Sequence, residues 1–134
     1  MKTIAVSGYF IWPHVGHMQY FRQAAKYGNV IAIVNNDEQQ KLKYGKILVP
    51  LEERIEILRD NKNITLVIPS IDKDRTVCKT LEQLRPDYFG KGGDSSYANV
   101  PEMEICNRLG IKTIFGLGEK VQSSSWLIKG LKDR

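Results

Sequence analysis

Long apolar runs are missing from this chain of 134 residues, and cysteine and histidine are scarce, with two of each. No apolar stretch approaches the ~20 residues that a membrane-spanning helix requires, so we expect no membrane partner. Cys78 and Cys106 lie far apart, without the spacing of a zinc site or a disulfide framework. We therefore expect reduced thiols in the core of a cytoplasmic protein, and no metal site built from side chains.

Positive charge is the main bias in composition, with 20 lysines and arginines against 15 acidic residues. The apolar fraction of 42% is that of an ordinary globular protein, and the chain is long enough to bury a substantial core. A formal charge of +5 favours anionic substrates. Nucleic acid is the alternative, but the lysines concentrate in one loop instead of alternating with aromatic platforms, so we expect no nucleic-acid partner.

Strand-like and helix-like segments alternate along the chain. Apolar runs predict strands at 2–6, 30–34, 64–68, 88–89 and 112–115. Helical spacing predicts helices at 17–27, 51–60, 77–84, 101–109 and 123–132, with a polar loop at 35–46. This order predicts one α/β domain over residues 1–134, with a Rossmann-like, doubly wound parallel sheet of five strands.

The segment from Gly8 to His17 follows the first predicted strand and reads GYFIWPHVGH. The junction of a first strand and a first helix is a usual ligand site in an open α/β sheet. A helix N-terminus favours phosphate, Gly16 permits close approach of the backbone, and the imidazoles of His14 and His17 can donate hydrogen bonds to oxyanions. The segment therefore predicts a polyphosphate site; the alternative is a turn with two solvent-exposed histidines.

The string His14-Val15-Gly16-His17 resembles the H-x-G-H motif of the nucleotidyltransferase superfamily. Its cytidylyltransferase-like members include glycerol-3-phosphate cytidylyltransferase and heptose-1-phosphate adenylyltransferase. The resemblance extends over nearly the whole chain. It implies in-line attack by an acceptor phosphate oxygen on the α-phosphate of a nucleoside triphosphate, with pyrophosphate as the leaving group. It also implies Mg²⁺ as the cofactor and a homodimer.

The same resemblance gives roles to residues around the motif. His14 and His17 would contact the α- and β-phosphates as catalytic residues. The nucleotide would lie against Gly8, Tyr9, Phe10 and Gly16. One departure is Ile11, which stands where many relatives have the aspartate of G-x-F-D. An apolar side chain cannot take over a polar role.

A lysine-rich stretch from Lys41 to Lys46 is the second match to the family. Relatives carry lysines in this loop and an arginine in the helix behind it. The resemblance places Lys43 and Lys46 on the nucleotide phosphates, with Lys46 catalytic. It places Arg54 on the phosphate of the acceptor or in support of the loop. Ammonium groups on a loop can follow charge toward the departing pyrophosphate. The alternative is a solvated cluster of charges.

Two later segments resemble nucleotide-binding strings of the family. Residues 91–94 read KGGD, as in heptose-1-phosphate adenylyltransferases, and three serines open the last predicted helix, as in the family's S/T-rich string. In isolation, a turn explains the first string and helix capping explains the second. The residues predicted to bind the nucleotide here are Lys91, Gly92, Gly93, Asp94, Ser123, Ser124 and Ser125.

Together these matches predict an enzyme that transfers a nucleoside monophosphate from CTP to a small phosphorylated acceptor such as glycerol 3-phosphate. An adenylyltransferase that uses ATP and a heptose 1-phosphate is the alternative within the family, since the KGGD string belongs to that branch. The alternative from another class is a nucleotide-binding module without catalysis, which Ile11 raises.

Overall fold

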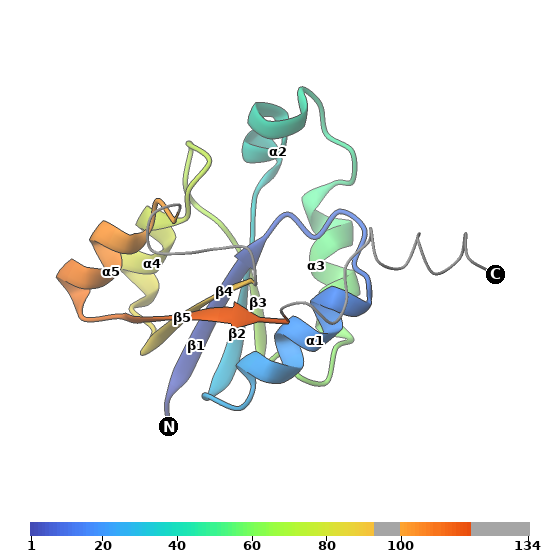
Figure 1. Cartoon of the computed structure of the whole chain (residues 1–134). Helices are drawn as coiled ribbons and strands as arrows, with labels where there is room; N and C mark the ends of the chain where they lie inside the picture. Colours follow the sequence, from blue (N-terminus) through green and yellow to red (C-terminus); the bar gives the residue numbers. More distant parts are fainter. Residues whose placement is uncertain (93–99, 119–134) are drawn as a thin grey trace, which may run out of the picture.

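The computed structural model describes residues 1–92 and 100–118, which form a parallel sheet of five strands with helices on both faces (Figure 1). The strands are β1 (Thr3–Gly8), β2 (Asn29–Val34), β3 (Leu66–Pro69), β4 (Tyr88–Gly92) and β5 (Lys112–Leu117). The helices are α1 (Val15–Ala24), α2 (Asp37–Tyr44), α3 (Leu51–Arg59), α4 (Cys78–Leu84) and α5 (Met103–Leu109). The predicted doubly wound, Rossmann-like sheet is confirmed.

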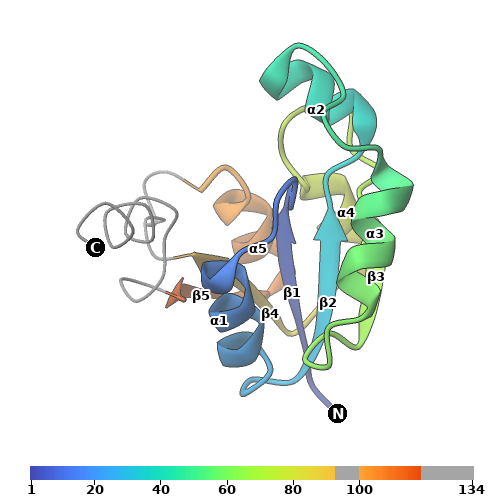
Figure 2. The same ribbon diagram turned by 90° about the vertical axis from the view of Figure 1, so that its right-hand side faces the viewer.

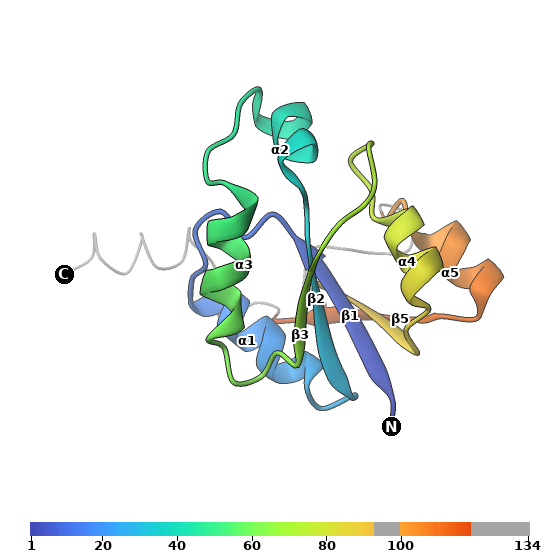
Figure 3. The ribbon, with the colours of Figure 1, turned by 180° about the vertical axis from the view of Figure 1, so that it is seen from behind.

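The strands lie in the order β3-β2-β1-β4-β5. The chain builds the sheet outward from β1 to β3 and then returns to the other side of β1 with β4. Helices α1 and α3 cover one face and α4 and α5 the other, as the view from behind shows (Figure 3). Helix α2 stands beyond the carboxyl ends of the strands (Figure 2). The crevice between β1 and β4 is therefore the topological switch point, where open α/β sheets bind ligands.

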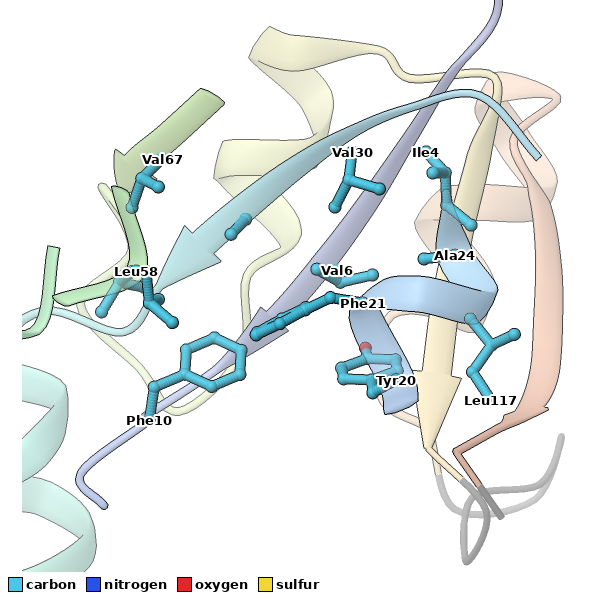
Figure 4. Packing of buried hydrophobic residues seen from close by; sticks show 12 residues of the cluster. Ile4, Val6, Phe10, Tyr20, Phe21, Ala24, Val30, Leu58, Val67 and Leu117 are labelled. Atoms are coloured by element: carbon cyan, nitrogen blue, oxygen red, sulfur yellow. The ribbon is translucent and has the colours of Figure 1, made fainter. Parts of the chain in front are cut away.

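Two apolar clusters, one on each side of the sheet, form the core. Under α1 and α3, Phe21 is fully buried over Val6 of β1, and the ring centroid of Phe10 lies 5.4 Å from that of Phe21 (Figure 4). Under α4 and α5, the cluster is built around Leu81 and Phe89. No helix in the described part of the chain combines the length and the apolarity needed to cross a membrane.

The prediction of a polar loop at 35–46 was wrong, because this segment contains α2. Asn36 caps the helix: its Oδ1 accepts from the Gln39 N–H at 2.9 Å, and its own N–H donates to Gln39 Oε1 at 2.9 Å. Gly45 ends the helix in the left-handed region, at φ 81°. The inward side chains are buried glutamines that donate to backbone carbonyls, Gln39 to Thr76 and Gln40 to Val49. The helix therefore shows no apolar periodicity.

The remaining elements predicted within the described residues are confirmed, with ends that shift by a few residues. Strand β4 continues through Gly90 to Gly92, although glycines usually signal the end of a strand. A Cβ at Gly90 would lie 2.6 Å from the side chain of Leu117. The hydroxyl of Tyr20 donates to the Gly90 carbonyl at 2.6 Å. A side chain at Gly90 would therefore force Leu117 of β5 to shift. The helix predicted at 123–132 lies outside the described residues.

A buried arginine joins four segments at the carboxyl ends of β1 and β2. The side chain of Arg54, in α3, is 0% exposed. Its Nη1 donates to the carbonyls of Tyr9 at 2.9 Å and Asn35 at 2.6 Å. Its Nε donates to the Val49 carbonyl, and its Nη2 to Asp37 Oδ1, each at 2.9 Å. Only a guanidinium offers donors in enough directions for this set of acceptors.

We predict that Arg54→Lys lowers the free energy of unfolding by about 2–4 kcal/mol, because one ammonium nitrogen cannot satisfy these four acceptors. Urea denaturation of the two proteins measures the loss. Arg59→Lys is the matched control, since Arg59 lies exposed on the same helix. Equal midpoints for the two variants would show that the buried network contributes little.

Candidate functional site

A cavity of about 540 Å³ opens at the carboxyl ends of β1 and β4. Its walls come from the loop after β1, the start of α1, the end of α2 and the loops that precede α4 and α5. The cavity therefore occupies the switch point of the sheet, where the topology places a ligand.

Seven of the predicted site residues line this cavity: Gly8, Tyr9, Phe10, His14, His17, Lys43 and Lys91. They come from β1, the loop after it, α1, α2 and β4. The fold thus brings together the first predicted motif, one lysine of the second and one residue of the third.

Four other predicted residues do not line the cavity. Gly16 is buried in the first turn of α1, and Gly92 ends β4. Lys46 is exposed just beyond α2. Of the two roles predicted for Arg54, the geometry favours support of the loop, because each nitrogen of its guanidinium donates to a protein acceptor. Gly93, Asp94, Ser123, Ser124 and Ser125 lie outside the described residues.

The two histidines cap the helix that they open. The Nδ1 atom of His14 accepts from the Gly16 N–H at 3.0 Å, and the Nδ1 atom of His17 accepts from the His14 N–H at 3.1 Å. The three-residue interval of the motif is therefore the interval of a capping box, with imidazole nitrogens as the acceptors. Because each Nδ1 is an acceptor, the neutral rings carry their proton on Nε2. Each histidine thus keeps one N–H donor for a ligand.

The imidazoles of His14 and His17 stack, with ring centroids 4.1 Å apart and an angle of 29° between the planes. Burial, and then the charge of His14, lower the pKa of His17 from 6.5 to about 4. His17 is therefore neutral at pH 7. An anion beside the ring would oppose both effects, so binding of a triphosphate is expected to raise this pKa.

Phe10 holds His17 in place from the loop after β1. Its backbone lies in the left-handed region at φ 50°, which is rare for an aromatic residue. The ring centroid of Phe10 lies 5.3 Å from that of His17, edge to face. A Cβ at Gly8 would approach the Phe10 ring to 2.8 Å, so a side chain at Gly8 would displace the ring. Gly8 and Phe10 therefore act on the site through packing.

Cationic side chains gather around the cavity. The Nζ of Lys43 lies 4.5 Å from the ring centroid of Tyr9 and 5.3 Å from that of Tyr44. These cation–π contacts position the ammonium group without the help of an acidic side chain. Burial raises the pKa of Tyr9, and a hydrogen bond with Arg75 opposes the shift. Together with Lys91, these groups make the cavity attractive to an anionic ligand.

Sequence reasoning missed five polar residues of the cavity wall: Ser7, Asn35, Tyr44, Arg75 and Glu102. Asn35 follows the apolar run of β2, and a polar residue at that position signals the binding edge of a parallel sheet. Arg75 and Glu102 precede helices, where charged residues are common for local reasons, so the sequence carried no separate signal for them.

Neither cysteine lines this cavity. Both are free thiols, and burial raises the pKa of Cys78 and raises that of Cys106 to about 11. Neither is therefore a thiolate at neutral pH, as expected for core residues. Among residues 1–92 and 100–118, no three His, Cys, Asp or Glu side chains gather as a metal site.

The lowered pKa of His17 predicts that stability falls with acidification. Between pH 6.5 and 4 the unfolded chain binds a proton at this ring that the folded protein does not, so the free energy of unfolding decreases as the pH falls through this window. We expect wild type to lose about 1–3 kcal/mol more than His17→Gln between pH 7 and pH 4, measured by urea denaturation. Glutamine can still accept from the His14 N–H. An equal loss in both proteins would contradict a neutral, partly buried His17.

Comparison with known proteins identifies the family. The family model described as cytidylyltransferase-like matches residues 5–120. The chain is 35% identical over 98 residues to the bifunctional protein HldE of Hydrogenovibrio crunogenus, an alignment that covers 69% of this chain and 20% of that protein. The chain thus spans about a fifth of the length of this relative.

A second relative matches along its whole length. The FAD synthase of Methanohalophilus mahii is 26% identical over 139 residues, covering 100% of this chain and 96% of that protein. Among solved structures, the lipopolysaccharide core biosynthesis protein of Thermoplasma volcanium aligns with a TM-score of 0.71 and 24% identity, covering 87% of this chain and 94% of that one, and supports the fold. The match over residues 5–120 shows that the chain belongs to the cytidylyltransferase-like family of nucleotidyltransferases.

Proposed function

We propose that this protein transfers a nucleoside monophosphate from a nucleoside triphosphate to the phosphate group of a small acceptor, with release of pyrophosphate. The observation that carries the proposal is the pair of stacked imidazoles at the start of α1. Their Nδ1 atoms are occupied by backbone N–H groups, so two Nε2–H donors remain at the cavity. A nucleotide held there meets the N-terminal end of the α1 dipole as well.

The chemistry consists of positioning and charge stabilisation. An acceptor phosphate oxygen attacks the α-phosphorus in line, a P–O bond to it forms, and the bond to the β-phosphate breaks. Negative charge then grows on the equatorial α-phosphate oxygens and on the leaving pyrophosphate. The Nε2–H groups of His14 and His17 stabilise the former, and the ammonium groups of Lys43 and Lys91 neutralise the latter. We also propose that Lys46, which follows α2, closes on the phosphates.

The residues of the cavity fit Mg²⁺ that arrives on the nucleotide. Within the described residues, Glu102 is the one acidic side chain of the cavity, and Ile11 occupies the position of the family's aspartate. Mg²⁺ commonly keeps its waters and binds through substrate phosphates. Bound in that way, the ion would neutralise charge on the triphosphate. The protein's own groups then orient the nucleotide and exclude water.

Two nucleotides remain candidates. The family model's description favours CTP, as the sequence predicted. The relative that matches the whole chain favours ATP, because its product FAD contains an AMP group joined to a flavin phosphate. Glycerol 3-phosphate and a heptose 1-phosphate are the acceptors to test first. We further propose that the protein is a cytoplasmic homodimer, a state that its resemblance to the family implies.

Pyrophosphate release tests the proposal directly. CTP, ATP, UTP and GTP are each paired with glycerol 3-phosphate, heptose 1-phosphate and flavin mononucleotide in the presence of Mg²⁺. We expect release from one nucleotide with one acceptor. His17→Ala should lower kcat about 10²–10³-fold, since it removes one preorganised donor to the α-phosphate.

Arg22→Ala is the matched control, because Arg22 is exposed in the last turn of α1 and should leave kcat unchanged. Binding of CTP or ATP without release from any pair would support the alternative of a silent nucleotide-binding module, which Ile11 raises. Full activity in His17→Ala would remove His17 from the mechanism.

A further inference from the structure

Glu102 places a buried carboxylate at the wall of the cavity, and the proposed mechanism does not use it. The residue is 4% exposed and lies directly before α5. Its Oε2 accepts from the Val77 N–H at 3.0 Å. Its Oε1 is buried and has no hydrogen-bond partner within the described residues. A buried carboxylate oxygen without a donor is destabilising, so its presence beside a cavity needs an explanation.

The position and the charge of this carboxylate both argue against a phosphate as its partner. Glu102 precedes α5, and Val77 precedes α4, on the face of the sheet opposite α1 (Figure 3). The histidines and the positive end of the α1 dipole attract the triphosphate to the other side of the cavity. A carboxylate would repel phosphate oxygens, whereas it accepts strongly from a hydroxyl or an amino group.

We infer that Glu102 Oε1 accepts a hydrogen bond from a hydroxyl or amino group of a substrate in this cavity and thereby determines specificity. The inference rests on the proposed function, because it requires that a nucleotide and an acceptor share the cavity. Both substrates carry such donors: the nucleoside on its ribose and base, the acceptor on its polyol or sugar. A binding site with a buried acceptor rejects ligands that lack the matching donor, since the acceptor then stays unpaired.

Glu102→Gln isolates this oxygen from the structural role of the side chain. The amide carbonyl can still accept from the Val77 N–H, while the amide nitrogen takes the place of Oε1 and cannot accept. The matched control is Glu104→Gln, an exposed residue in the first turn of the same helix. We expect both variants to keep the wild-type melting temperature to within a few degrees.

The experiment measures nucleotide and acceptor separately. Calorimetric titration of each protein with CTP and with ATP, without an acceptor, gives the nucleotide Kd. Steady-state kinetics with the pair that wild type uses gives the acceptor KM. We expect Glu102→Gln to weaken one of these about 10- to 100-fold and to leave the other unchanged. A change in Kd assigns the donor to the nucleotide, and a change in KM assigns it to the acceptor.

Substrate analogues without the donor complete the test. If the hydrogen-bond donor lies on the nucleotide, removing it should weaken binding to wild type. The matching analogue (2′-deoxy, 3′-deoxy or without the base amino group) should then bind wild type as weakly as the unmodified nucleotide binds Glu102→Gln. The variant should lose nothing further with that analogue.

Three results would overturn the inference. The first is that Glu102→Gln keeps the nucleotide Kd and the acceptor KM of wild type. The second is a raised Mg²⁺ requirement with both affinities unchanged, which would make Glu102 a metal ligand. The third is an equal effect in Glu104→Gln. The proposed function fails separately, when wild type releases no pyrophosphate from any pair. An inactive wild type whose nucleotide Kd is insensitive to Glu102→Gln would overturn both.

Discussion

The guanidinium of Arg54 is buried among backbone carbonyls at the end of the sheet where the cavity opens. Two of these carbonyls belong to Tyr9 and Asn35, which follow β1 and β2 and form part of the cavity wall. The other bonds hold the start of α2 and the approach to α3. The course of both loops therefore depends on one side chain that does not reach the cavity. Such a buried charge is tolerated because each of its nitrogens has an acceptor.

Helix stability and ligand chemistry share the same atoms at the start of α1. The Nδ1 atoms of His14 and His17 accept from the backbone, which satisfies two N–H groups near the helix start and fixes the tautomer of each ring. The Nε2–H groups remain for an oxyanion. The spacing of the motif is thus explained by the geometry of a helix cap before any ligand is considered. Serine would cap as well but would leave no N–H donor for the ligand, whereas each imidazole keeps its Nε2–H.

Local patterns predicted much of the fold and the position of the two histidines at the end of the first strand. The apolar run at 30–34 and the motif at 14–17 are signals within a few residues, and the structure places both as expected. Helix α2 escaped prediction because buried glutamines replace its apolar face. The roles of Arg54 and Glu102 depend on partners 45 and 25 residues away, and such pairings leave no trace in a local pattern.

The central claim is that the imidazoles of His14 and His17, whose Nδ1 atoms accept from the backbone, present Nε2–H donors to a triphosphate. Nitrogen-15 NMR of the histidine side chains at pH 7 tests it most directly, first in the free protein and then with CTP or ATP added. We predict that His14 and His17 have an unprotonated Nδ1 in the free protein, that the neutral ring of His17 is the Nε2–H tautomer, and that saturating nucleotide shifts the Nε2 signals of both residues. A protonated Nδ1 in either ring, or Nε2 signals that do not respond to a bound nucleotide, would contradict the account.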